Sequence, residues 1–184
     1  MKQLRLFILI LFISTLVSCG AYQYATAEKG SDGATKEQQA DVKTQVMKLL
    51  EEEYNQPFKL ESFDYEYERH WVDNTCQMSF CKMKKYGTYY FKIKAIDNPI
   101  IIIDFNMNDG LATKESIKPL IDSFKKNQLN DLFCIGLTRY YSRLTKNLNM
   151  KPQQPYTESA EKYCNSINQN GYKIYKDYYT KNKK

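Results

Sequence analysis

An alternation of aromatic and acidic residues over positions 63–68 constrains the fold of this chain more than any other feature. The six residues run in the order Phe63, Asp64, Tyr65, Glu66, Tyr67 and Glu68. A repeat of two residues places the rings on one side of a β-strand and the carboxylates on the other, as in an antiparallel sheet with one face in solvent. Phe58 and Leu60, earlier in the same stretch, have the opposite phase. We therefore predict a strand from Phe58 to Arg69 with a β-bulge near Glu61-Ser62.

Two further strands are predicted after a long polar connection. The first spans Thr88–Ile96, in which Lys92 and Lys94 occupy alternate positions. In an antiparallel pair with the acidic strand, we expect these lysines to lie opposite the three carboxylates, where opposite charges help to select the register. The second spans Ile100–Phe105 and contains four consecutive isoleucines. Such a run favours burial on both faces, in a central or helix-covered position.

Helical periodicity flanks these strands. Apolar residues repeat at helical spacing within Lys36–Glu53. Three later helices are predicted, one beginning at Thr113 and two spanning Leu132–Leu148 and Thr157–Asn168, the last with Thr157 as its N-cap. The segment from Tyr172 to Tyr178 fits either a weak strand or a terminal helix. The predicted fold class is α+β, with an N-terminal helix packed on a three- to four-stranded antiparallel sheet and followed by two or three C-terminal helices.

The first twenty residues have the three-part layout of a secretory signal, with Lys2 and Arg5 preceding an apolar run. That run is about a dozen residues long, shorter than the roughly 20 that a spanning helix needs. It ends in Leu16-Val17-Ser18-Cys19, followed by Gly20, and this arrangement resembles the lipobox of a bacterial lipoprotein signal peptide. The alternatives are a transmembrane anchor and an ordinary leader in which the cysteine is incidental.

The resemblance covers residues 1–20 only and implies an address for the chain. Cys19 would receive a thioether-linked diacylglycerol and become the new N-terminus, often with a further acyl chain, and two or three chains give stable anchoring. Gly20 stands where aspartate is associated with inner-membrane retention, so the outer membrane is the favoured location within the cell envelope, on its periplasmic face or at the cell surface. A Gram-positive host would place the protein on the outer face of the plasma membrane.

The resemblance and the composition together predict three parts. Residues 1–18 are the signal peptide, residues 19–35 are a lipidated flexible tether rich in small residues, and residues 36–184 are a single α+β domain. Without the signal peptide, 166 of the 184 residues remain, which suits one domain. The net charge of +6 falls to about +4 without Lys2 and Arg5, too little for a nucleic-acid-binding protein.

Four cysteines follow Cys19 in the sequence, namely Cys76, Cys81, Cys134 and Cys164. Outside the cytoplasm an even number favours disulfides, and four cysteines allow three connectivities. We favour Cys76–Cys81 and Cys134–Cys164, because the first two lie in one local loop. Buried free thiols and a zinc site that includes the single histidine are the alternatives.

The best candidate for metal chemistry resembles a calcium loop of the EF-hand type. Its ligands would be Asp104, Asn106, Asn108 and Glu115, at loop positions one, three, five and twelve. The sixth position, which usually needs glycine, is Asp109, and Gly110 comes one place late. A polar turn between a strand and a helix explains the same residues. We therefore expect no metal and no other cofactor.

Catalytic candidates are few. His70 is the single histidine, and no serine or cysteine stands in a recognisable nucleophile motif near it. Tyrosine is abundant, with 16 residues. We expect Tyr65, Tyr67, Tyr89 and Phe91 to form an aromatic binding surface, because such rings offer a large rigid contact area. The alternative is that tyrosine simply suits β-strands.

These observations favour a non-enzymatic, lipid-anchored binding protein of the bacterial cell envelope, of the inhibitor, immunity or accessory type. Its partners would be the membrane, through the N-terminal lipid, and a protein, with no nucleic acid. The alternative function is a small envelope hydrolase or a calcium-binding protein that uses His70 or the Asp104–Glu115 loop. That alternative needs a cleft in which these side chains converge.

Overall fold

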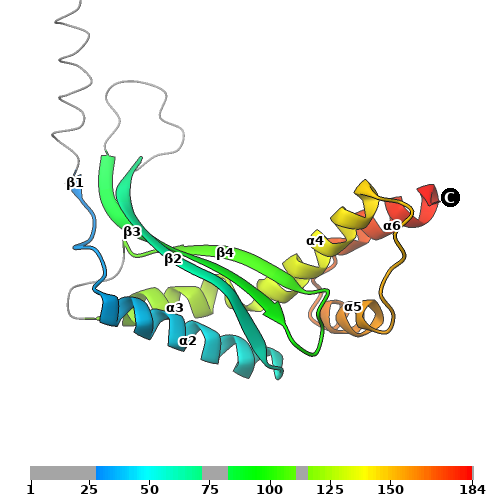
Figure 1. Ribbon diagram of the computed structural model, residues 1–184, viewed down its shortest axis with the longest axis horizontal. Helices are drawn as coiled ribbons and strands as arrows, with labels where there is room; N and C mark the ends of the chain where they lie inside the picture. The colour runs from blue at the N-terminus through cyan, green and yellow to red at the C-terminus, as the bar shows by residue number, and fades with distance from the viewer. Residues whose placement is uncertain (1–27, 72–82, 111–115, 184) are drawn as a thin grey trace, which may run out of the picture.

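The computed structural model describes residues 28–71, 83–110 and 116–183 (Figure 1). The elements in these ranges are β1 (Glu28–Lys29), α2 (Lys36–Tyr54), β2 (Phe58–Trp71), β3 (Met83–Ala95), β4 (Ile102–Asn108), α3 (Lys118–Asn127), the 3-10 turn η1 (Leu129–Asp131), α4 (Leu132–Lys146), α5 (Tyr156–Ser166) and α6 (Tyr172–Asn182). The predicted α+β fold class is confirmed. The segment from Tyr172 is the helix α6, so four α-helices follow the sheet in the described part of the chain.

Strand β3 is the centre of the sheet. It pairs antiparallel with β2 along one edge and with β4 along the other, and β1 pairs parallel with its first residues. The register of β2 against β3 shifts between Leu60 and Ser62, which confirms the predicted bulge. The extra residue at Glu61 brings Leu60 and Phe63 onto the same face of the sheet.

The predicted register between β2 and β3 is wrong. Lys92 lies opposite Ser62 and Lys94 opposite Lys59, whereas the three carboxylates of β2 face tyrosines and a threonine. Aromatic packing selects the observed register, because it places Phe63 opposite Phe91 with ring centroids 5.0 Å apart. An exposed cross-strand charge pair contributes only about 0.2–1 kcal/mol, less than a buried aromatic pair with its contact area.

The core lies between one face of the sheet and the helices. Helix α2 begins with a capping box formed by Thr35 and Gln38 and buries one stripe against the sheet, namely Val42, Val46, Leu50 and Tyr54. The alternate residues of β3 that meet this stripe are also buried, namely Tyr89, Phe91, Ile93 and Ala95. Helix α3 covers the same face, where Phe124 stacks on Phe105 at 5.4 Å (Figure 1).

Strand β4 begins at Ile102, two residues later than predicted, and is an edge strand. Three of the four isoleucines are nevertheless buried, because α4 packs over this end of the strand. The approach is close: a Cβ on Gly136 would lie 2.9 Å from Cγ2 of Ile101. The helix-covered position is therefore observed and the central one is not.

The C-terminal helices form a unit at one end of the sheet (Figure 1). The predicted disulfide between Cys134 on α4 and Cys164 on α5 is present, with Cα atoms 5.7 Å apart. Thr157, the predicted N-cap of α5, is instead a fully buried residue of its first turn, since the helix begins at Tyr156.

Residues 28–35, here called the N-terminal strap, lie against the sheet. Gly30 and Ser31 donate their backbone N–H groups to the carbonyl of Lys85, at 2.7 and 3.1 Å. The Ala34 N–H donates to the hydroxyl of Tyr65 at 2.7 Å. Residues 28–35, which the composition assigned to the flexible tether, therefore lie in contact with the sheet.

Candidate binding surface

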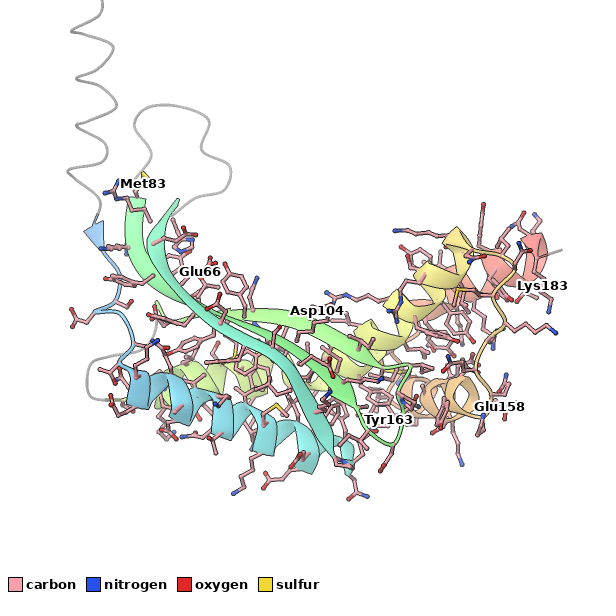
Figure 2. The ribbon with its side chains drawn as sticks, in the orientation of Figure 1. Glu66, Met83, Asp104, Glu158, Tyr163 and Lys183 are labelled. Atoms are coloured by element: carbon pink, nitrogen blue, oxygen red, sulfur yellow. A yellow bond between two sulfur atoms is a disulfide. The ribbon has the colours of Figure 1, made fainter. Side chains whose placement is uncertain are left out.

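One face of the sheet is left open by the helices that pack on the other. Helices α2 and α3 both lie on the core side, and Figure 2 shows Glu66 and Asp104 on the side away from α2. We call this open side the polar face. Its principal side chains, by alternation along the strands, are Asp64, Glu66, Glu68 and His70 of β2, Lys84, Tyr86, Tyr90, Lys92 and Lys94 of β3, and Asp104, Asn106 and Asn108 of β4.

The corrected register separates the charges of the polar face into two halves. The acidic half consists of Asp64, Glu66 and Glu68, and none of them forms an ion pair within the described ranges. The basic half begins at Lys92 and Lys94, towards the bulge. Successive carboxylates on one strand face are roughly 6.6 Å apart, so the acidic half presents a row of negative charge.

Aromatic side chains accompany the acidic half. Tyr90 is 36% exposed, and partial burial together with the charges of Glu66 and Glu68 raises the pKa of its hydroxyl. At the far end of β2, His70 stacks on Tyr86 with ring centroids 3.9 Å apart. A row of carboxylates beside exposed rings suits a cationic group, because the charges attract it and the ring faces add cation–π contact.

The basic half has acidic neighbours of its own. Lys59 pairs with Glu61 in the bulge at 3.0 Å, and this hydrogen bond and the charges of nearby lysines lower the pKa of Glu61. Arg139 of α4 donates to the carbonyl of Asp104 at 2.8 Å and lies 3.4 Å from its carboxylate. The charges of the basic half are therefore partly balanced by these neighbours, whereas the carboxylates of the acidic half form no ion pair with a described residue.

The predicted calcium loop does not form at its first three positions. Asp104, Asn106 and Asn108 are consecutive outward residues of β4 and not residues of a loop. Cα atoms at the two ends of this set are roughly 13 Å apart in an extended strand, whereas calcium ligands converge at 2.3–2.6 Å from one ion. Glu115 lies outside the described residues. No group of three His, Cys, Asp or Glu side chains that could hold a metal is found in the described part of the chain.

The two catalytic candidates lie far apart. His70 pairs with Lys84 and Asp104 with Lys92, eight positions further along β3. At about 3.3 Å a residue, their positions are separated by roughly 26 Å. The described residues therefore do not bring His70 and Asp104 into one cleft, which the hydrolase alternative requires.

Two of the four residues of the predicted aromatic surface lie in the core, and the other two are half-buried. Tyr89 and Phe91 are 0% and 2% exposed, and Tyr65 and Tyr67 point to the same side of the sheet. Along β2 the rings and the carboxylates point to different faces of the sheet. The rings therefore lie on the face that the helices cover. The tyrosines of the open side are Tyr86 and Tyr90, which the sequence analysis did not select. Tyr86 and Tyr90 stand at the same alternate positions of β3 as Lys92 and Lys94. This spacing is the sequence signal that places them on the open side.

A buried carboxylate that the sequence analysis treated as a turn residue fixes the strap. Asp109 is 1% exposed. Its Oδ1 accepts from Oγ of Ser31 at 2.7 Å and from the N–H of Gly87 at 2.5 Å, and Tyr65 donates to Oδ2. Three donors to one ionised group form charge-assisted hydrogen bonds that offset the cost of its burial. Asp109 is therefore structural.

The remaining predicted site residues Cys19, Cys76 and Cys81 lie outside the described residues. Comparison of the chain with protein-family models, with curated proteins and with solved structures finds no match. Among the described residues, no helix has both the length and the apolar character needed to cross a bilayer.

Proposed function

We propose that this protein is a lipid-anchored, non-enzymatic binding protein of the bacterial cell envelope, of the inhibitor, immunity or accessory type. Cys19 is the proposed lipidation site, and the polar face is the proposed contact with a protein partner. The observation that carries the proposal is the open face of the sheet, on which no carboxylate of the acidic half forms an ion pair with another described residue.

The arrangement of charge supports a protein partner. A surface with separate acidic and basic halves orients a complementary surface, because the wrong orientation places like charges together. The exposed ring of Tyr90 and the half-buried ring of Tyr86 add contact area of the kind that is enriched in interfaces. A partner with lysines or arginines over the acidic half fits both features.

The partner contact is tested by site-specific cross-linking in intact cells. A photoreactive benzoylphenylalanine replaces Tyr90 on the polar face or, as a control, Lys48 on the exposed side of α2. We expect one protein to be captured from position 90 and not from position 48. Capture from both positions alike, or from neither, would contradict the assignment.

A charge variant sharpens this test. Asp64→Asn, Glu66→Gln and Glu68→Gln together remove the acidic half, and we expect the cross-linked product to be lost. The matched control also removes three exposed carboxylates, through Asp41→Asn, Glu52→Gln and Glu53→Gln on α2. The control is expected to keep the product, which separates a local contact from a general effect of net charge.

The lipid anchor is tested separately. Intact mass of the membrane-extracted protein should equal the chain from Cys19 onward plus a diacylglycerol and an acyl chain. Cys19→Ala should release the protein from the membrane fraction. A variant that stays firmly bound to the membrane would refute the anchor.

A further inference from the structure

A second surface, remote from the acidic half, has the character of a membrane contact. The C-terminal ends of α4 and α6 lie side by side, where the hydroxyl of Tyr179 donates to the carbonyl of Met150 at 2.5 Å (Figure 1). The last turns of α4 and α6 and the connection after α4 carry five exposed basic residues, of which Lys151 and Lys183 line one recess with Tyr179. They are Arg143, Lys146, Lys151, Lys181 and Lys183. We call this surface the basic end.

No acidic residue interrupts these two segments of the chain. Residues 141–155 and 178–183 contain no aspartate or glutamate, and the one acid near them on α6 is Asp177, exposed between Ile174 and Lys181. Lysines near a helix C-terminus complement the helix dipole, which accounts for Lys146 and Lys181. It does not account for Lys151, which stands in the connection between α4 and α5. The basic end therefore carries more positive charge than helix capping explains.

Exposed apolar side chains occur on the same two segments, and on α6 they lie on the side away from the buried Tyr179, together with Lys181. Met150 is 48% exposed, Tyr178 is 55% exposed, and Ile174, one turn earlier on α6, is 74% exposed. Apolar side chains and tyrosine flanked by lysines are the composition of helices that lie in the interface of a bilayer. A recess of about 400 Å³ lies on the Tyr179 side of α6, lined by Lys151, Lys183 and neighbouring uncharged residues.

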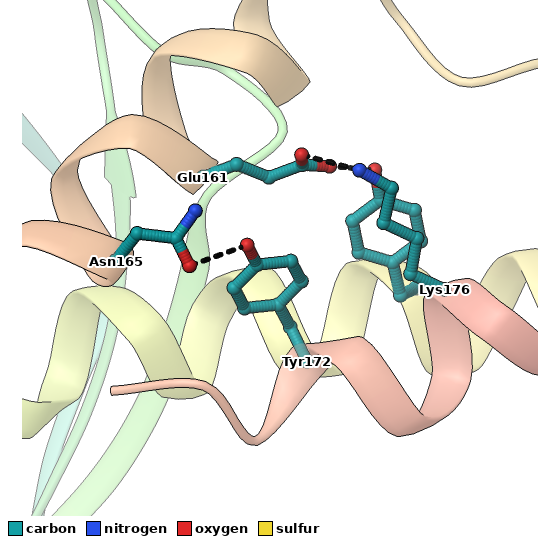
Figure 3. Close-up of polar contacts among 5 residues, drawn as sticks. Glu161, Asn165, Tyr172 and Lys176 are labelled. Carbon is teal, nitrogen blue, oxygen red and sulfur yellow. Dashed lines mark hydrogen bonds and ion pairs between the residues drawn. The ribbon is translucent and has the colours of Figure 1, made fainter. Parts of the chain in front are cut away.

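The opposite side of α6 is fixed, so these side chains have no alternative place in the core. Figure 3 shows Lys176 of α6 paired with Glu161 of α5 at 2.5 Å and Tyr172 donating to Asn165 at 2.9 Å. Tyr172 and Tyr179 are buried on this inner side. Ile174 and Tyr178 are therefore held outward by the packing of α6 itself.

We propose that the basic end binds an anionic lipid surface, as a second membrane contact beside the lipid at Cys19. The charge of the basic end is complementary to acidic headgroups, and its apolar side chains supply shallow insertion. In Figure 1, β1 and the C-terminal end of α6 lie at opposite ends of the molecule and both on the side away from α2. A planar membrane in contact with both ends would lie opposite the polar face. This orientation rests on the proposed function, because it assumes the lipid at Cys19, whereas binding of the basic end to lipid does not.

Vesicle binding tests the proposal without the lipid anchor. The chain from residue 19 onward, carrying Cys19→Ala, is sedimented with vesicles of phosphatidylcholine alone or with about one third phosphatidylglycerol. We expect binding to the anionic vesicles only. Lys151→Gln, Lys181→Gln and Lys183→Gln together should weaken it on the order of a hundredfold. The control variant Lys48→Gln, Lys118→Gln and Lys125→Gln removes the same charge from α2 and α3 and should bind as the parent does.

The outcomes separate this inference from the proposed function. Equal loss in the two lysine variants, or equal binding to both kinds of vesicle, overturns the basic end as the site. Ile174→Ser should weaken binding roughly tenfold, whereas Ile96→Ser, also exposed, should not. If the parent is instead a dimer that Ile174→Ser dissociates, the surface is an interface between copies and the proposal fails. The tested chain carries Cys19→Ala and therefore has no lipid. Its vesicle binding does not depend on whether the natural protein is anchored through Cys19.

Discussion

Replacing Gly87 with alanine should destabilise the domain more than any other single methyl group added to the sheet. A Cβ at this position would lie 1.9 Å from the hydroxyl oxygen of Tyr65 and 2.1 Å from its Cζ. Atoms cannot approach this closely, so the ring must move. The hydroxyl that moves with it donates to the buried carboxylate of Asp109 and accepts from the N–H of Ala34.

The expected magnitude follows from these contacts. Losing a hydrogen bond to a charged group costs about 1.5–3 kcal/mol, and losing the neutral one costs about 1 kcal/mol. Overpacking adds about 1–3 kcal/mol, of which the movement of the ring relieves a part. We expect Gly87→Ala to lower the free energy of unfolding by about 3–5 kcal/mol. Gly110→Ala is the control, because the nearest atom to its new Cβ among the described residues is the side-chain oxygen of Asn108, 3.4 Å away.

Denaturant unfolding followed by circular dichroism measures both variants. Gly110→Ala should change stability by less than about 0.5 kcal/mol. Tyr65→Phe, which removes only the hydroxyl, should cost about 2–3 kcal/mol. In the double variant of Gly87 and Tyr65 the two costs should overlap by about 2 kcal/mol, since the hydroxyl is lost only once. Strict additivity, or a Gly87→Ala protein as stable as its parent, would refute the reasoning.

Three other substitutions or conditions have expected outcomes. Cys134→Ser with Cys164→Ser should lower stability by about 3.7 kcal/mol in the chain-entropy model, measured against the parent under oxidising conditions. Gly136→Ala should cost about 1–2 kcal/mol despite its gain in helix propensity, because the new methyl meets Ile101 at 2.9 Å. Burial raises the pKa well above the usual 10.0 at Tyr54, Tyr65, Tyr89 and Tyr141. Their contribution to stability is present below pH 10 and is lost as the pH rises further, so ultraviolet titration should show them ionising late and together with unfolding.

The strands and their bulge could be predicted from the sequence because both depend on local order. The change of phase between Leu60 and Phe63 is visible in six consecutive residues, and the structure has its register shift there. Which residue of β3 faces which residue of β2 depends on packing between strands. Exposed charges suggested one alignment, and the buried ring of Phe91 selected another.

The strap could not be predicted, because its partners are distant in the sequence. Ser31 reaches Asp109 across 78 positions, and Tyr65 reaches the same carboxylate across 44. Locally, Asp109 and Gly110 have the composition of a polar turn, and residues 28–35 that of a linker. The composition of a segment indicates how little apolar surface it can bury. It does not indicate whether the folded sheet offers donors and acceptors to the backbone of that segment.

The strap changes what a lipid at Cys19 would do. Only residues 20–27 remain between the proposed lipidated cysteine and Glu28, where the chain joins β3. Eight extended residues span at most about 26–29 Å, half the reach of the sixteen-residue tether that the sequence suggested. That distance is close to the length of the polar face itself, roughly 26 Å from His70 to Asp104. In the proposed lipid-anchored protein, an anchor this short would hold the polar face near the membrane and favour partners that are themselves at the membrane surface.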